Sequence, residues 1–182
     1  THVALFVQYW ISQADMCSAS KCAFAVDSAT GVLSRTGGSL CGDPGCKFLS
    51  LSGLSFSSIA PGTFDGMSHL VVLDLSNNQL ANITHDDFKD LTALEKLMLS
   101  MNRLTSIAPG TFAGLHALQN VSLYNNKLAS IEAGTFAGSD GLSAMETLDL
   151  SNNELGFISE GGFEGLSNVR TLKLNINGAT PY

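Results

Sequence analysis

Aliphatic residues recur along most of this chain in a pattern that repeats every 24 residues. Each unit contains two aliphatic residues separated by a single residue, as in Leu73 and Leu75 or in Leu148 and Leu150. Because successive side chains of a β-strand point to opposite faces, both members of such a pair face the same side. The pattern therefore predicts one short parallel strand in each unit, with its leucines in a shared core.

Two further residue types recur in register with the leucines. The aligned units begin at residues 46, 70, 94, 118, 145 and 169, and three extra residues at 139–141 break the period once. An asparagine follows each pair where the chain turns, and its amide is suited to bond backbone groups that the turn leaves unpaired. This expected ladder comprises Asn78, Asn102, Asn126, Asn153 and Asn177, whereas the first unit has Leu54 in this position. A second column, expected to fill the convex side of the core, comprises Phe64, Phe88, Phe112, Phe136 and Phe163.

The repeated pattern LxxLxLxxNxLxxIxxxxFxxL resembles the extracellular, 24-residue form of the leucine-rich repeat family over residues 46–177. The resemblance implies an α/β solenoid, a horseshoe with a parallel β-sheet on the concave face and short turns on the convex face. Five full repeats and a partial sixth would form this solenoid at residues 46–182. Residues 1–45 would form an N-terminal apolar strand and a disulfide-bearing cap.

All four cysteines lie in the first quarter of the chain, namely Cys17, Cys22, Cys41 and Cys46. An even number confined to one end predicts two disulfides in an oxidising compartment, so we expect a secreted or cell-surface location. The spacing leaves three pairings open. A zinc site of four thiolates is the alternative, which the four-residue gaps and the absence of a nearby histidine disfavour.

The most apolar run of the chain is its first segment, 1–11, which is too short to span a bilayer as a helix. A signal-peptide core followed by the sequence SQA is one interpretation. We favour a β-strand that is apolar on both faces, because aliphatic and aromatic residues alternate there. The residues concerned are Val3, Leu5, Phe6, Val7, Tyr9, Trp10 and Ile11.

Charge and motif content argue against several classes of function. Nine basic residues against 16 acidic ones give a formal charge of −7, and no basic cluster occurs, so nucleic acid is not an expected partner. No catalytic or cofactor motif occurs, and no histidine stands at metal-ligand spacing from another histidine or a cysteine. We interpret the cluster from His85 to Asp87 as a solvated turn. The sequence therefore predicts no enzyme, cofactor or metal site.

Family members usually bind ligands through the concave face, so the resemblance implies a role in protein-protein interaction. The residues on or beside the predicted strands that have the character of interface hot spots are Phe48, Val72, Met98, Met101 and Tyr124. We also expect Asp149 and Lys173 to pair across adjacent strands. Two sequons, at Asn82 and Asn120, predict N-linked glycans, and a glycan on Asn120 would obstruct the concave face.

The last repeat carries apolar residues with no recognisable cap after them, namely Val169, Leu172 and Leu174. An uncovered edge strand favours the addition of another strand. The sequence thus supports the hypothesis that the N-terminal strand or cap of one copy docks onto this repeat of the next. Such a head-to-tail contact produces a structural or filament subunit unless it closes into a ring. The alternative is a ligand-binding module of a secreted or cell-surface receptor, with a protein or glycan on the concave face.

Overall fold

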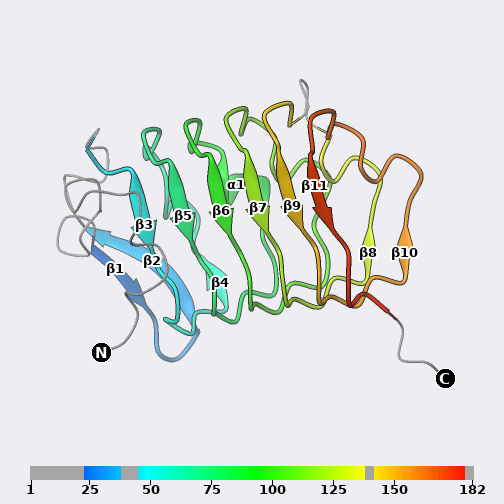
Figure 1. The fold of residues 1–182 in the computed structure, drawn as a ribbon. Helices are drawn as coiled ribbons and strands as arrows, with labels where there is room; N and C mark the ends of the chain where they lie inside the picture. The colour runs from blue at the N-terminus through cyan, green and yellow to red at the C-terminus, as the bar shows by residue number, and fades with distance from the viewer. Residues whose placement is uncertain (1–22, 38–44, 138–141, 179–182) are drawn as a thin grey trace.

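The computed structural model describes residues 23–37, 45–137 and 142–178, and these form a stack of coils (Figure 1). The coils contribute three-residue strands to a six-stranded parallel sheet in the order β11-β9-β7-β6-β5-β3. The strands are β3 (Phe48–Ser50), β5 (Val72–Asp74), β6 (Lys96–Met98), β7 (Asn120–Ser122), β9 (Thr147–Asp149) and β11 (Thr171–Lys173). The predicted solenoid, with one short parallel strand in each repeat, is therefore confirmed.

The central residue of each strand points into the solenoid and stacks on its equivalent in the next coil. Leu73, Leu97, Val121 and Leu148 lie in register along the sheet, and each is 0% exposed. Full burial of one such side chain contributes about 1.5–3 kcal/mol relative to exposure. The paired leucines of the sequence pattern thus form the continuous core of the molecule.

The convex side consists of short segments, as the sequence predicts. It contains the one-turn helix α1 (His85–Phe88) and the two-residue strands β4 (Ser58–Ile59), β8 (Ser130–Ile131) and β10 (Phe157–Ile158), of which β8 and β10 pair in parallel. Beneath these segments, the Phe136 ring lies between those of Phe112 and Phe163, with centroid distances of 6.0 and 6.2 Å. The recurring phenylalanines therefore form a second stacked column inside the solenoid.

Side-chain amides hold the turns that follow the strands. Asn102 Nδ2 donates to the carbonyl oxygens of Leu75 and Leu99 at 3.0 and 3.1 Å, and its Oδ1 accepts from the backbone N of Leu80 at 3.0 Å. The same donor and acceptor pattern recurs at Asn126, Asn153 and Asn177. Each asparagine thus joins its own turn to the preceding coil.

The first coil departs from this ladder because it lacks the asparagine. Leu54 occupies the position, and Ser55 adopts a left-handed backbone with φ of 64°. In the next coil, Asn78 still donates to Leu51 and Leu75, but within the described part of the chain its buried Oδ1 accepts no hydrogen bond. The altered turn therefore leaves one rung of the ladder incomplete.

A β-hairpin lies against the first coil. It consists of β1 (Ala23–Val26) and β2 (Val32–Gly37), which pair antiparallel, and β2 also pairs in parallel with β4 on the convex side. Leu33 of β2 is 0% exposed, and the ring of Phe24 lies 6.1 Å from that of Phe64. The hairpin thus extends the core past the first repeat.

Part of the N-terminal prediction falls outside the described residues. The expected strand at 1–11 lies there, as do Cys17, Cys22 and Cys41. Cys46 is described, and it is buried and disulfide-bonded. The division into a cap at 1–45 and a solenoid at 46–182 stays a prediction.

Candidate functional site

The outward-facing side chains of the sheet form three columns across the concave surface. The first contains Phe48, Val72, Lys96, Asn120, Thr147 and Thr171, in the strand register. The second contains Ser50, Asp74, Met98, Ser122, Asp149 and Lys173. The third follows just after the strands and contains Ser52, Ser76, Ser100, Tyr124, Ser151 and Asn175. Most of the surface is thus built from hydroxyl and amide groups.

Two of the predicted concave contact residues are buried. Phe48 and Val72 are only 6% and 7% exposed, although they occupy outward-facing positions of their strands. Their burial weighs against ligand contact at these two positions, which stays a prediction, because alternation along a strand identifies the face of a residue and not its exposure. Met98 is half-buried, and Met101 and Tyr124 are exposed.

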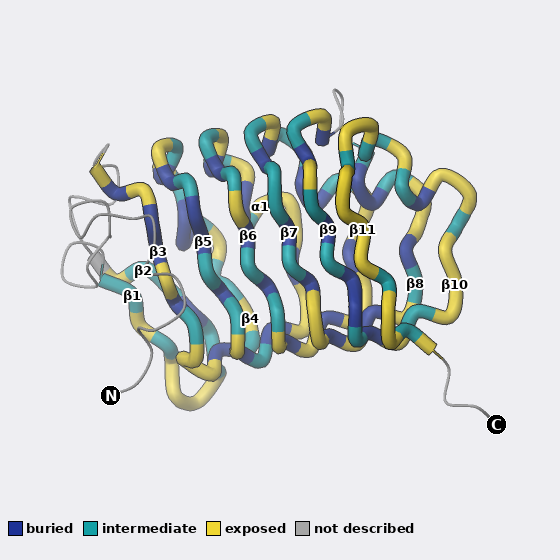
Figure 2. The backbone as a smooth tube through the Cα atoms, viewed as in Figure 1, coloured by how far each residue is buried: buried dark blue, intermediate teal, exposed yellow. Residues whose placement is uncertain are grey.

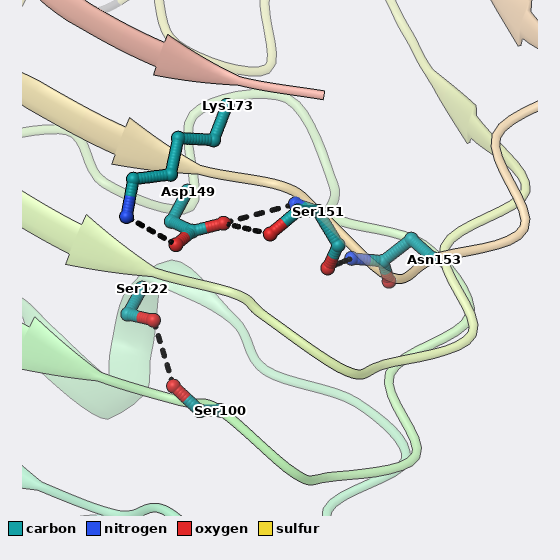
Figure 3. Close-up of polar contacts among 6 residues, drawn as sticks. All are labelled: Ser100, Ser122, Asp149, Ser151, Asn153 and Lys173. Atoms are coloured by element: carbon teal, nitrogen blue, oxygen red, sulfur yellow. Dashed lines mark hydrogen bonds and ion pairs between the residues drawn. The ribbon is translucent and has the colours of Figure 1, made fainter. Parts of the chain in front are cut away.

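Hydrogen bonds between hydroxyl and carboxylate groups order the middle of this surface. Ser100 and Ser122 join through their hydroxyl oxygens at 2.7 Å (Figure 3). Ser50 donates to Asp74 at 3.2 Å. Ser52 and Ser76 join in the same way at 3.1 Å. Because these groups satisfy one another, the surface is held in place before any partner arrives.

Two acidic residues of the concave face, Asp74 and Asp149, each accept hydrogen bonds from three groups, and among the described residues only Asp149 forms an ion pair with a neighbouring strand. Its Oδ1 accepts hydrogen bonds from the backbone N and hydroxyl of Ser151, and its Oδ2 lies 3.1 Å from Lys173 Nζ (Figure 3). The expected pairing of Asp149 with Lys173 is thus confirmed. Partial burial raises the pKa of Asp149, but the hydrogen bonds from Ser151 and the contact with Lys173 outweigh it, so the pKa lies below its ordinary value.

A shallow groove of about 250 Å³ lies across the strands β6, β7, β9 and β11. Its rim includes two cations, Lys96 and Lys173, and one anion, Asp149. Met98 supplies apolar surface, and Asn120, Ser122 and Thr147 supply neutral polar groups. A groove that mixes apolar, neutral polar and charged groups suits a polypeptide better than a small apolar ligand.

The two sequons lie in different surroundings. Asn82 is exposed, whereas Asn120 lies in β7 at the groove and is half-buried. Glycosylation of either residue stays a prediction. Its consequence differs between them, because only a glycan on Asn120 would occupy the groove.

The cluster from His85 to Asp87 forms the start of α1. Asp87 Oδ2 accepts hydrogen bonds from the backbone N and the hydroxyl of Thr84, at 2.7 and 3.1 Å, and so caps the helix. Burial raises the pKa of Asp87 and outweighs the opposing hydrogen bonds from Thr84. Over the described residues, no group of three or more histidine, cysteine, aspartate or glutamate side chains is placed to hold a metal ion. No helix in the same residues is long and apolar enough to cross a membrane.

The last two coils expose apolar side chains at the C-terminal end of the described solenoid. Leu172 is 40% exposed, whereas its equivalent Leu148 is 0% exposed, and Phe157 of β10 is 61% exposed. Figure 2 shows β10 and β11 largely in the colour of exposed residues. Val169 and Leu174 are half-buried. A pocket of about 240 Å³ at this end is lined by Leu155, Gly156, Phe157, Ile158, Leu174 and Asn177.

Comparison with known proteins places these features in a family. The model of the family described as leucine rich repeat matches residues 46–104, 92–142 and 139–178. No curated protein sequence matches the chain significantly.

Solved structures of similar architecture come from larger proteins. A chain of the TLR13–ssRNA13 complex has a TM-score of 0.62 and 26% identity, over 75% of this chain and 21% of that one. A chain of the Toll–Spatzle complex from Drosophila has a TM-score of 0.65 and 26% identity, over 70% of this chain and 16% of that one. For the LRIM1/APL1C complex the TM-score is 0.56 and the identity 28%, over 60% of this chain and 20% of the other. The chain thus spans about a fifth or less of the length of these proteins.

Proposed function

We propose that this chain, which belongs to the leucine-rich repeat family, is a non-enzymatic module that binds a protein partner on the concave face of its sheet. The observation that carries the proposal is the groove across β6, β7, β9 and β11, where Lys96 and Met98 lie on a surface ordered by hydroxyl groups. A preordered surface loses little conformational entropy when a partner binds. The similarity to chains from the Toll–Spatzle and LRIM1/APL1C complexes supports a protein as the partner.

We also propose an extracellular location, either secreted or at the cell surface. The disulfide bond of Cys46 supports it, because disulfides persist in oxidising compartments. Two disulfides among the four N-terminal cysteines, together with glycans at Asn82 and Asn120, belong to the same proposal. Mass spectrometry of the secreted protein, with and without reduction and deglycosylation, tests all three features.

A substitution that fills the groove tests the site of binding. Thr147 is half-buried in the groove and its side chain makes no hydrogen bond among the described residues, so Thr147→Arg adds bulk and charge without breaking such a bond. Ser106→Arg, at an exposed position outside the sheet, is the matched control. The assay measures binding of each variant to an array of folded extracellular proteins. We expect Thr147→Arg to lose the partners that the wild type and Ser106→Arg retain, and equal binding by all three would reject the concave site.

Self-association through the C-terminal end of the described solenoid is a second candidate function, favoured by the exposure of Phe157, Ile158 and Leu172. These side chains would be covered by the N-terminal strand or cap of another copy, which would give a head-to-tail assembly. Electron microscopy and the solution mass of the full chain test this candidate. We expect assemblies that disappear when residues 1–11 are deleted, and a full chain that remains monomeric at high concentration would reject self-association.

A further inference from the structure

The turns that follow the concave strands use a left-handed backbone in every coil. Asn77, Asn125 and Asn152 occupy this position with φ of 55–56°, and Gly53 does so in the first coil with φ of 74°. Asparagine and glycine tolerate this conformation better than other residues. Local folding requirements therefore explain the residue found in these four turns.

Met101 occupies the same position with φ of 56° and breaks the rule. Its side chain is 48% exposed, so burial does not compensate for the unfavourable backbone. Ile176, in the last coil, shows the same combination, with φ of 56° and 74% exposure. Residues that violate a local rule without compensation are often retained for function.

Met101 lies next to a second exposed side chain with the character of an interface residue. The backbone N of Met101 donates to the carbonyl oxygen of Tyr124 at 2.8 Å, so the two residues lie in adjacent coils. Tyr124 is 38% exposed, although the equivalent positions in four other coils are serines. Methionine and tyrosine are both enriched in protein interfaces.

Two cations follow this pair in the sequence, one in each of the same two coils. Arg103 and Lys127 occupy equivalent positions in the same adjacent coils, as shown by the hydrogen bonds from their backbone N atoms to Leu80 and Leu104. Both side chains are exposed, and neither takes part in the ion pairs found among the described residues. Adjacent coils lie about 4.8 Å apart, so the two positive charges act together. Glu154, in the next coil, marks the end of this cationic surface.

We propose that Met101, Arg103, Tyr124 and Lys127, here called the turn patch, bind an acidic polypeptide segment that carries an apolar side chain. The proposal rests on the proposed function of protein binding and adds the chemistry of the partner. Charge complementarity supports it, because the whole chain carries a net charge of −7, whereas the turn patch carries two cations that lie outside the ion pairs of the described residues. The methionine and tyrosine supply the apolar contact that such a segment requires to bind with specificity.

Selection of peptides on the full chain tests this proposal. The probe is a phage-displayed library of random 12-residue peptides, selected on the wild type at low salt. We expect the selected peptides to be rich in aspartate and glutamate, to carry an apolar residue, and to bind more weakly as salt is added. They should bind at least 10-fold more weakly to Arg103→Glu/Lys127→Glu.

The matched control is Lys89→Glu/Arg170→Glu, which changes the net charge by the same four units at exposed positions in other parts of the solenoid. Peptide binding should be unchanged in this control. A second variant, Met101→Asn, separates contact from stability, because it places a favoured residue in the left-handed turn. It should raise the melting temperature while weakening peptide binding several-fold.

Four outcomes would overturn the proposal. If no acidic peptide is selected, or if the two charge-reversal variants weaken binding equally, the turn patch has no specific role. If the peptides lose affinity for Thr147→Arg but not for the patch variant, the concave groove binds the partner and only the turn patch is rejected. If a mixed-sequence single-stranded RNA of 13 nucleotides binds through the patch in place of peptides, the partner is a nucleic acid.

Discussion

Asn102 Oδ1 accepts a hydrogen bond from the backbone N of Leu80 at 3.0 Å, so a side chain of one coil holds the turn of the coil before it. The same amide donates to Leu75 of the preceding coil and to Leu99 of its own coil. A single residue thus satisfies three buried backbone groups. The stack depends on such contacts because each coil is too small to bury its own polar backbone.

Removal of one such amide should destabilise the solenoid. We expect Asn102→Ala to lower the free energy of unfolding by about 2–4 kcal/mol, because it leaves three buried backbone groups without a partner. Asn78→Ala is the matched control, since the Oδ1 of Asn78 accepts no hydrogen bond among the described residues. Its cost should be smaller by about 1 kcal/mol. Urea denaturation followed by circular dichroism measures both values, and equal losses would contradict the role assigned to the acceptor.

The stacked phenylalanines predict that the loss of stability on removing a ring depends on the place of that ring along the solenoid. Phe136 is 1% exposed and packs between two other rings, so Phe136→Ala should cost about 3–5 kcal/mol. Phe163 lies at the end of the column, in the coil that begins at residue 145, and is half-buried, so Phe163→Ala should cost less than half as much. Thermal and urea unfolding of the two variants give the comparison. A larger loss for Phe163→Ala would show that the last coil is covered in solution.

The left-handed backbone of these turns predicts opposite changes in stability for two substitutions. Ile176→Asn should raise the free energy of unfolding by about 1 kcal/mol, because a β-branched residue is strained at φ of 56° and its 74% exposed side chain gains little from burial. Asn125→Ile should lower it by about 1–2 kcal/mol for the same reason. Asn125→Gly serves as the control, since glycine adopts this backbone freely. Unfolding midpoints in urea that move in the opposite directions would refute this account.

The lowered pKa of Asp149 predicts how this residue contributes to the pH dependence of stability. Its pKa is lowered in the folded state, so its contribution is present above the pKa of the unfolded chain and is lost as the pH falls through the folded value. We therefore expect Asp149→Asn to flatten the decline in unfolding free energy between about pH 5 and pH 2. Asp87 has a raised pKa, so its contribution is present at low pH and declines as the pH rises through the folded value. Asp87→Asn should thus change the slope in the opposite direction, and changes of the same sign in both variants would contradict these assignments.

The sequence by itself determined the repeat, the strand of each coil and the residues of the core. Leu73, Asn102 and Phe136 each recur at a fixed place in a 24-residue unit, so their roles follow from periodicity and from the chemistry of one residue type. The pairing of Asp149 with Lys173 was predictable for the same reason, because the repeat length sets the strand register. Because similar units stack on one another, residues that are one period apart in the sequence are neighbours in space.

Only the tertiary structure decided which outward-facing residues remain accessible. Phe48 and Val72 are buried although they share a column with the exposed residues Lys96 and Thr171, and the repeat places all four at the same position of their strands. The hairpin of β1 and β2 also breaks the period, since β2 pairs with β4 on the convex side and inserts Leu33 into the core. The repeat specifies contacts between equivalent positions of successive coils. The exposure of a residue and the covering of an end depend on segments that do not repeat, so the 24-residue period does not predict them.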